Sequence, residues 1–266
     1  MNRACPIISL LTDFGSQDYF VAVMKAVILG IVPSARIIDI CHDIPAQDIR
    51  RAAFVLTCSY SYFPKGTIHL AVVDPGVGSS RRPILIKTKN YFFVGPDNGI
   101  FSLVLRQQSL VKVIHLSKER FFLTPISQNF HGRDIFAPVA AWLARGVAPE
   151  EFGPRLDSFT RLSFASPLVK KEKIIGEIIY IDHFGNLVTN IHKDLLDGFC
   201  QSAKDFRIII RGKMVTGLVN SYSDLPKSKA LAIIGSANYL EVAVNIGSAE
   251  KFFRAREGMK VEVWRR

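Results

Sequence analysis

The chain has 266 residues, of which 48% are hydrophobic and 21% are charged, and this balance excludes a disordered or fibrous protein. Its length can bury the core of one large domain or of two modest ones. The longest apolar runs are too short or too interrupted to cross a bilayer, so we expect no membrane span. The formal net charge of +11 would suit nucleic acid binding, but the Lys and Arg residues lie in small scattered groups, so we do not expect that function.

The N-terminus passes almost at once into a strand-like run without a small-residue cleavage site, so we expect no signal peptide. The cysteines form no CxxC pair, which argues against a zinc site or a redox motif. We therefore expect thiols in a reducing cytoplasm. These cysteines are Cys5, Cys41, Cys58 and Cys200.

The first part of the chain alternates β-branched runs with stretches of helical period, a pattern typical of a sheet covered by helices. It predicts an α/β domain over residues 1–165 with a Rossmann-like, mostly parallel sheet. The helices are expected at 18–29, at 46–63 after a cap near Asp43, and at 132–144. The strands are expected at 7–11, 37–40, 67–73, 84–88, 91–94 and 111–115.

The composition changes after Phe164, where Ser166-Pro167 and the charged run 170–173 are typical of a linker. Short strands separated by turn residues follow, and they favour a small antiparallel barrel or sandwich over residues 174–266. These strands are expected at 174–181, 206–210, 231–234, 239–244 and 259–264.

Two carboxylates follow the first expected strand, in the segment TDFGSQD at 12–18. Ligands of open α/β sheets bind beyond the carboxyl ends of the strands. Asp13 at this position can accept hydrogen bonds from a ribose diol, and Asp18 can meet an ammonium group. Alternatively, both residues only cap the following helix.

Two further loops carry groups suited to acid–base chemistry. In VDPGVGSSRR, at 73–82, the glycines permit a tight turn that brings Arg81 back toward Asp74, either in a functional site or in a purely structural ion pair. In FHGRD, at 130–134, His131 can orient water or carry a proton, although a lone histidine is more often structural.

The second domain offers two candidate ligand loops. DHFGNLVTN, at 182–190, places an apolar Phe184 beside the amide of Asn186, and GSANYLE, at 235–241, offers small residues and backbone amides around Ser236. Either loop could be an ordinary turn. The chain lacks GxxxxGK[ST], GxSxG and a GxGxxG after the first strand, which argues against nucleoside triphosphate hydrolysis, a serine nucleophile elbow and ordinary dinucleotide binding.

Taken together, the motifs resemble the S-adenosyl-L-methionine hydroxide adenosyltransferase family, the hydrolytic relatives of the fluorinating and chlorinating enzymes. The resemblance spans nearly the whole chain and rests on LLTDFG, VDPGVGSSRR, GPDNG, FHGRD, DHFGNLVTN and GSANYLEVAVN, in that order. It implies an N-terminal α/β domain and a small C-terminal β-barrel, assembled as a homotrimer with active sites between subunits.

The resemblance also implies roles for individual residues. Asp74, Arg81 and His131 match the catalytic set of the hydrolytic branch. Asp13 matches the position that grips the ribose hydroxyls, and Asp18 matches one near the methionine end. The remaining matches are substrate contacts: Phe184 and Asn186 in the pocket, Tyr222 against adenine, and Ser236 at the amino-acid end.

The activity that this resemblance implies is hydrolysis of S-adenosyl-L-methionine at the ribose C5′ carbon, which yields adenosine and L-methionine without a metal or cofactor. Asp74 stands where the halogenating relatives have a tyrosine, and Gly132 stands where they have a halide-contacting serine. An anionic Asp74 would repel a halide, so we expect water as the nucleophile. Gln47 replaces an aromatic wall residue of the fluorinating enzymes. The alternative is a protein that binds S-adenosyl-L-methionine or adenosine without turnover.

Overall fold

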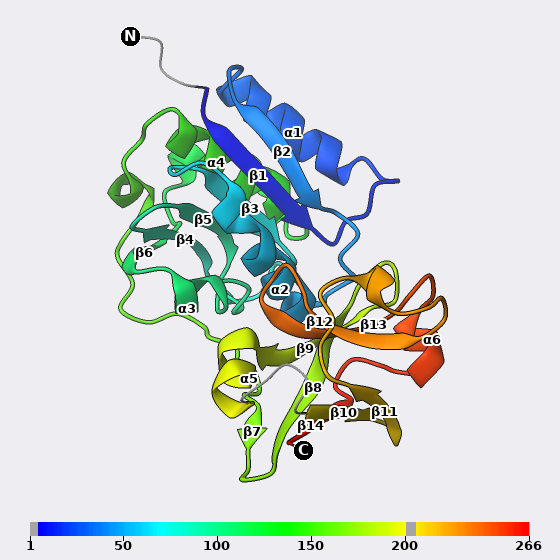
Figure 1. Cartoon of the computed structure of the whole chain (residues 1–266). Coiled ribbons are helices and arrows are strands. Elements are labelled where there is room, and N and C mark those ends of the chain that lie inside the picture. The colour runs from blue at the N-terminus through cyan, green and yellow to red at the C-terminus, as the bar shows by residue number, and fades with distance from the viewer. Residues whose placement is uncertain (1–4, 201–205, 266) are drawn as a thin grey trace. The chain divides into compact units, whose positions relative to one another are not determined.

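The computed structural model describes residues 5–200 and 206–265, which divide into two compact units (Figure 1). The first unit ends at Leu162 and the second begins at Ser163. The predicted domain limits, 1–165 and 174–266, stay a prediction. Among the described residues, no helix has both the length and the apolar character needed to span a membrane.

The first unit is built on a six-stranded mixed sheet with the order β2-β1-β3-β5-β4-β6. Neighbouring strands from β2 to β5 run parallel, whereas β4 runs antiparallel to both β5 and β6. The strands are β1 (Ile7–Thr12), β2 (Arg36–Cys41), β3 (Ile68–Val72), β4 (Pro83–Thr88), β5 (Phe92–Pro96) and β6 (Leu110–His115).

This sheet confirms the predicted α/β class but not the Rossmann-like description. The three residues 89–91 that join β4 to β5 are too few for a crossover helix, so the two strands form a hairpin and must run antiparallel. Thr88 closes this hairpin by donating its backbone N–H to the Tyr91 carbonyl at 2.9 Å. The short link was visible in the sequence, so the mixed topology could have been predicted.

Helices cover both faces of the sheet. The core on one face joins β1 and β3 to α1 and α4, and the core on the other face joins them to α2. Successive residues of β3 alternate between these cores: Leu70 and Val72 face the first, and Ala71 faces the second. The helices are α1 (Phe20–Ile31), α2 (Ile49–Ser59), α3 (Val104–Gln107) and α4 (Ala137–Ala144), with 3₁₀ turns at Tyr60–Tyr62, Glu119–Phe121 and Pro149–Phe152.

The three predicted helix starts, at 18, 46 and 132, all precede the observed starts of α1, α2 and α4. Asp48 rather than Asp43 caps α2, and its side chain accepts a hydrogen bond from the Arg51 backbone N–H at 2.9 Å. Before α4, the residues Gly132–Phe136 form a π-helical turn, in which the Ala137 N–H reaches back to the Gly132 carbonyl. A single π-turn of five residues is too short to show a hydrophobic period in the sequence, so the prediction merged this segment with the helix that follows.

The second unit contains an eight-stranded antiparallel sheet, in which seven strands follow the order β11-β10-β14-β8-β9-β13-β12 and the eighth, β7, pairs with β8. The end strands β11 and β12 contact each other, so the sheet nearly closes into a barrel around an apolar core. The strands are β7 (Leu168–Val169), β8 (Lys173–Ile181), β9 (Leu187–His192), β10 (Phe206–Ile210), β11 (Lys213–Thr216), β12 (Ala230–Ile234), β13 (Tyr239–Val244) and β14 (Lys260–Arg265).

The antiparallel, barrel-like arrangement confirms the predicted class of the second unit. The prediction missed β7, β9 and β11. It missed β9 because it treated 182–190 as one loop, although the β-branched second half of this segment is typical of a strand. Short helices α5 (Lys193–Phe199) and α6 (Ala249–Phe253) and a 3₁₀ turn at Tyr222–Asp224 complete the unit.

Candidate active site

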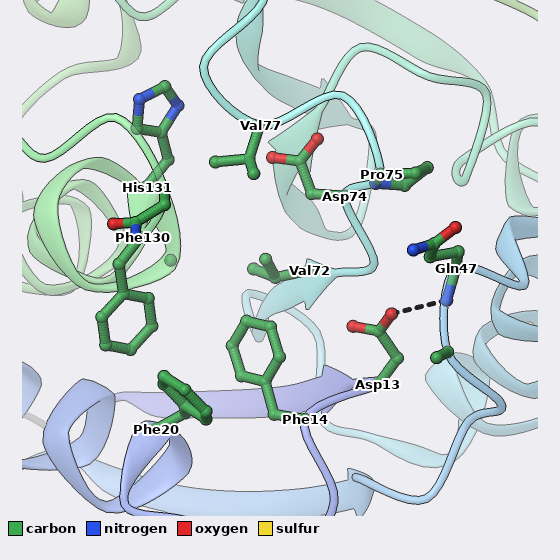
Figure 2. Close-up of a pocket in the computed structure, with 13 residues that line it drawn as sticks. Asp13, Phe14, Phe20, Gln47, Val72, Asp74, Pro75, Val77, Phe130 and His131 are labelled. Carbon is green, nitrogen blue, oxygen red and sulfur yellow. Dashed lines mark hydrogen bonds between the residues drawn. The ribbon is translucent and has the colours of Figure 1, made fainter.

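A pocket of about 380 Å³ lies where β1 and β3 end. Thr12 pairs with Val72 in the parallel register of these strands, so Asp13 and Asp74, which follow them, come to the same edge of the sheet. Figure 2 shows the rings of Phe14, Phe20 and Phe130 to the left of Asp13 and below Asp74. The pocket is lined by Asp13, Phe14, Phe20, Ala46, Gln47, Val72, Asp74, Pro75, Val77, Asn129, Phe130, His131 and Gly132.

Asp13 is held against the loop before α2. Its Oδ2 accepts a hydrogen bond from the Gln47 backbone N–H at 2.8 Å (Figure 2), and Gln47 adopts a left-handed backbone conformation with φ of 67°. Burial raises the pKa of Asp13, and the nearby charge of Asp74 raises it further. Hydrogen bonds from the backbone N–H groups of Gln47 and of Asp13 itself lower the pKa. Neither Asp13 nor Asp18 caps α1. The cap position is Tyr19, and no side-chain hydrogen bond is made there.

Arg81 joins Asp74 to His131. Its guanidinium grips the Asp74 carboxylate in a bidentate pair, Nε to Oδ1 at 2.8 Å and Nη2 to Oδ2. The same Nη2 lies 2.8 Å from Nδ1 of His131. The structure therefore brings together the three residues that were predicted to be catalytic, although Arg81 and His131 lie 50 residues apart in the sequence. Both members of the ion pair are almost fully buried, with side chains 9% and 6% exposed.

The contact with Arg81 fixes the tautomer of His131. A guanidinium can only donate, so Nδ1 must accept, and the proton of the neutral ring resides on Nε2. Burial and the Arg81 charge lower the pKa of His131, although Asp74, Asp134 and a hydrogen bond to the Ser127 backbone act in the opposite direction. The ring is thus neutral at neutral pH, as its contact with a cation requires.

A glycine allows the loop of Asp74 and Arg81 to touch the loop of His131. Gly78 has φ of +77°, and a Cβ atom built there would lie 2.4 Å from the Gln128 carbonyl oxygen. Any other residue would push the loop that carries Asp74 and Arg81 away from the loop that carries His131. On the opposite side, the Asn98 side-chain amide donates to the Val73 carbonyl at 2.8 Å and holds the end of β3.

A second glycine keeps the aromatic wall of the pocket in place. A Cβ atom at Gly132 would lie 3.2 Å from the Met24 sulfur, 3.4 Å from the Phe130 ring and 3.5 Å from the Phe14 ring. The rings of Phe14 and Phe130 meet edge to face with centroids 5.9 Å apart. A serine at position 132 would require the Met24 sulfur to move by a few tenths of an ångström.

Two predicted contacts of the second unit, Asn186 and Tyr222, each donate a hydrogen bond to a carboxylate. Asn186 is buried and donates its side-chain amide to Oδ2 of Asp182 at 2.9 Å. Tyr222 donates its hydroxyl to Oε1 of the buried Glu241 at 2.7 Å. Burial raises the pKa of Glu241, the Tyr222 hydrogen bond opposes this, and the Asp182 charge adds to it. Asn186 and Tyr222 therefore belong to one polar cluster with Asp182 and Glu241.

The other predicted binding residues lie outside these clusters of buried contacts. Asp18 and Ser236 are exposed, and Asp18 does not line the pocket of the first unit. Phe184 has 73% of its surface exposed, while its backbone N–H donates to Asp182 at 2.9 Å. Their roles in binding stay predictions.

Among the polar residues of these sites, Asn129, Asp182 and Glu241 were not singled out as contacts by sequence reasoning, whereas Gln47 was expected at the pocket wall. Gln47 and Asn129 line the pocket from loops whose approach depends on the tertiary fold. Asp182 and Glu241 stood inside the quoted motifs, and the available signal was an acidic residue directly after β8 or within β13. No group of three or more His, Cys, Asp or Glu within residues 5–200 and 206–265 is arranged to hold a metal ion. The metal-free chemistry stays a prediction.

A pocket at the ends of parallel strands, with paired carboxylates and a histidine fixed by an arginine, is the arrangement of an enzyme that acts on a small polar molecule. The chain belongs to the SAM hydroxide adenosyltransferase family, in which SAM is S-adenosyl-L-methionine. The family's N-terminal domain matches residues 8–153, and its C-terminal domain matches residues 176–262.

Individual relatives agree with this assignment. The chain is 37% identical to a Thermus thermophilus protein named (R)-S-adenosyl-L-methionine hydrolase, over 95% of this chain and 97% of the relative. It is 27% identical to a fluorinase of Nocardia brasiliensis over 98% of each chain. A crystal structure of an uncharacterized conserved protein from Thermotoga maritima superposes with a TM-score of 0.92 at 39% identity, covering 97% of this chain and all of the other.

The hydrogen bond from Tyr222 to Glu241 can be tested by mutation. Replacing Tyr222 by Phe removes the hydroxyl that donates to Glu241 and leaves a buried acceptor without that donor. We expect the free energy of unfolding to fall by about 1–3 kcal/mol in urea denaturation at neutral pH. Tyr62→Phe, which removes a hydroxyl from a side chain 79% exposed, is the matched control and should change it by less than about 0.5 kcal/mol. Equal losses in the two variants would contradict the assignment.

Proposed function

We propose that this chain hydrolyses S-adenosyl-L-methionine to adenosine and L-methionine. The observation that carries the proposal is the joint contact of Asp74 and His131 with Arg81 beside the pocket of the first unit. The names of the relatives point to the same reaction. An oxygen of water forms a bond to C5′, the bond from C5′ to sulfur breaks, and its electron pair stays on the sulfur. One proton of the water is released.

The leaving group of this reaction needs no assistance. A sulfonium becomes a neutral thioether when it departs, so neither a general acid nor a Lewis acid is required at sulfur. The difficulty lies with water, which is a weak nucleophile unless a base accepts its proton. We therefore propose that the reaction proceeds without a metal or cofactor.

The geometry assigns different tasks to the three side chains. Each Asp74 oxygen accepts one N–H of Arg81 and keeps a second lone pair for water in the pocket. His131 uses its Nδ1 lone pair on Arg81, so it cannot accept the proton there. We propose that Asp74 accepts the proton, that Arg81 fixes the carboxylate, and that His131 fixes Arg81. Asp13, which also lines the pocket, is proposed to accept hydrogen bonds from the ribose hydroxyls, and Asp18 to contact the methionine end.

The source of the new oxygen distinguishes hydrolysis from its alternatives. Purified chain incubated with S-adenosyl-L-methionine in ¹⁸O-labelled water and a metal chelator should yield adenosine labelled at its 5′-hydroxyl, together with methionine. Asp74→Asn keeps the shape of the side chain but removes its basicity, and it is the matched inactive control. Tight binding without any product would instead select the alternative of a non-catalytic binding protein.

The acid side of the pH–rate profile follows from His131. Its pKa is lowered from 6.5 by burial and by Arg81, so the ring gains a proton only when the pH falls below that value. Protonation removes the lone pair that Arg81 uses and places two cations together, so activity should be lost there and not above. We expect kcat/KM to stay level through neutral pH and to fall with an apparent pKa below 6.5. An inflection at or above the ordinary histidine value would contradict the neutral tautomer assigned here.

We further propose that the protein is a homotrimer with each site shared between neighbouring subunits. The pocket lies wholly in residues of the first unit, whereas Phe184, Asn186, Tyr222 and Ser236, the other proposed contacts, all lie in the second. Phe184 and Tyr222 are 73% and 43% exposed and are therefore accessible to a ligand held by another chain.

Subunit mixing tests this arrangement together with the mass from light scattering. Asp74→Asn chains and Asn186→Ala chains, each inactive alone, should regain part of the activity after joint refolding if a site takes these residues from different chains. The mass should equal three chains. A monomer, or no recovery in mixtures, would contradict the shared site.

We also propose a cytoplasmic location. Among the described residues, which include all four cysteines, there is no disulfide, and thiols persist in reducing compartments. Fractionation of cells that express the tagged chain tests the location.

A further inference from the structure

The turn that follows β5 lies between the two ends of the loop that carries Asp74 and Arg81. β5 pairs in parallel with β3 on one side and antiparallel with β4 on the other. The loop 73–82 leaves the end of β3 and returns into the start of β4, so it must cross the end of β5. The turn 97–99 begins at that end and is therefore within reach of both ends of the loop.

Asn98 holds the first end of the loop. Its Nδ2 donates to the Val73 carbonyl at 2.8 Å, and this carbonyl belongs to the peptide bond that leads into Asp74. Its Oδ1 accepts the Ile100 backbone N–H at 3.2 Å, which is the bond that shapes an Asx turn. The turn itself requires only this acceptor, and an aspartate would supply it equally well. The bond to Val73 is therefore an addition that the turn does not need.

Asp97 holds the second end. Its side chain is 2% exposed, and Oδ2 accepts Nε and Nη2 of Arg82 at 3.0 and 2.6 Å. Its backbone N–H also donates to the Arg82 carbonyl at 2.9 Å. Arg82 directly follows Arg81, so these bonds fix the chain next to the guanidinium that contacts His131. Oδ1 of Asp97 accepts the Thr160 backbone N–H at 2.6 Å, which anchors the carboxylate outside the loop.

We propose that Asn98 and Asp97 are positioning residues for the hydrolysis: they hold the two ends of loop 73–82 and thereby keep Arg81 in contact with His131. The inference rests on the proposed function for its effect on rate. The bidentate pair of Asp74 and Arg81 fixes these two side chains relative to each other. It does not fix the pair relative to the strand ends, and the contacts of the turn after β5 do so.

Asn98→Asp tests the first end. It keeps the shape of the side chain and the acceptor for Ile100, but it replaces the donor to Val73 by an oxygen that the carbonyl repels. We expect kcat to fall about 10- to 100-fold, because a displacement of about 1 Å is enough for such a loss. KM should change little, because Asp13, the proposed ribose contact, is held by Gln47 and not by this turn.

Asn190 in the second unit offers a matched control. Its Nδ2 donates to the Ala165 carbonyl at 3.0 Å, and its Oδ1 accepts the Glu177 backbone N–H at 2.9 Å. Asn190→Asp therefore removes the same kind of bond and adds the same charge, so it should lower the free energy of unfolding as Asn98→Asp does. It should leave kcat unchanged. Equal losses of kcat in the two variants would overturn the proposal.

Asp97→Asn tests the second end. The amide keeps an oxygen for Thr160 but removes the charge that faces Arg82, so kcat should again fall about 10- to 100-fold with little change in KM. Glu262→Gln changes another carboxylate that has several side-chain donors, in the second unit, and it should leave kcat unchanged. A loss of kcat in only one of Asn98→Asp and Asp97→Asn would contradict a loop held at both ends.

Ring ¹⁵N shifts of His131 give a readout that does not depend on turnover. Nη2 of Arg81 keeps Nδ1 of the ring unprotonated, so the wild-type chain should show a single Nε2–H tautomer. Both turn variants should show a mixture of tautomers, because the guanidinium is displaced from the ring. The signal is assigned from its loss in His131→Gln. If the wild-type chain shows no hydrolysis, the proposed function fails, and the tautomer still decides whether the turn positions Arg81.

A third variant keeps the test decisive if Asn98→Asp does not fold. Asn98→Ser removes the Nδ2 donor without adding a charge, and its hydroxyl oxygen can still accept from Ile100. It should lower kcat and mix the tautomers of His131 to a smaller extent than the aspartate. Loss of stability in the turn variants with an unchanged kcat and a single tautomer would overturn the proposal.

Discussion

Two loops from distant parts of the chain meet at the Arg81 guanidinium, and the candidate site depends on that meeting. Without its positive charge, the carboxylates of Asp74 and Asp13 would face each other in a largely buried pocket, where like charges repel strongly. Without the Nη2 donor of Arg81, Nδ1 of His131 would lose its hydrogen-bond partner. One side chain thus sets the charge balance of the pocket and the protonation pattern of its histidine.

The scaffold around this contact is made largely of backbone groups. Parallel pairing of β1 and β3 brings Asp13 and Asp74 to one edge, and the missing side chain of Gly78 allows the loops to close on each other. The pairing fixes these strand ends, because shifting one strand against the other would break several backbone hydrogen bonds at once. Such preorganisation is what a reaction with a weak nucleophile requires, since the water must be held in line before the bond to sulfur breaks.

The sequence revealed more about the residues that follow strands than about those brought together by folding. Asp13, Asp74 and Arg81 stood at strand ends and turns, where the local pattern itself indicates a site. From the sequence alone, the pair of Asp74 and Arg81 could be either structural or functional. The structure shows that they are an ion pair that also contacts His131 beside a pocket. The pairing of Tyr222 with Glu241 could not be predicted, because it links a 3₁₀ turn to a strand 19 residues later.

The π-helical turn at Gly132–Phe136 gives the site an unusual dependence on chain length. A π-turn is equivalent to one extra residue inserted into an α-helix. Removing that residue would let α4 continue backwards as regular helix while rotating every position ahead of it about the helix axis. The imidazole would then swing away from the guanidinium although no residue of the pocket had been replaced. A single deletion in this buried helix start is therefore expected to break the contact between His131 and Arg81.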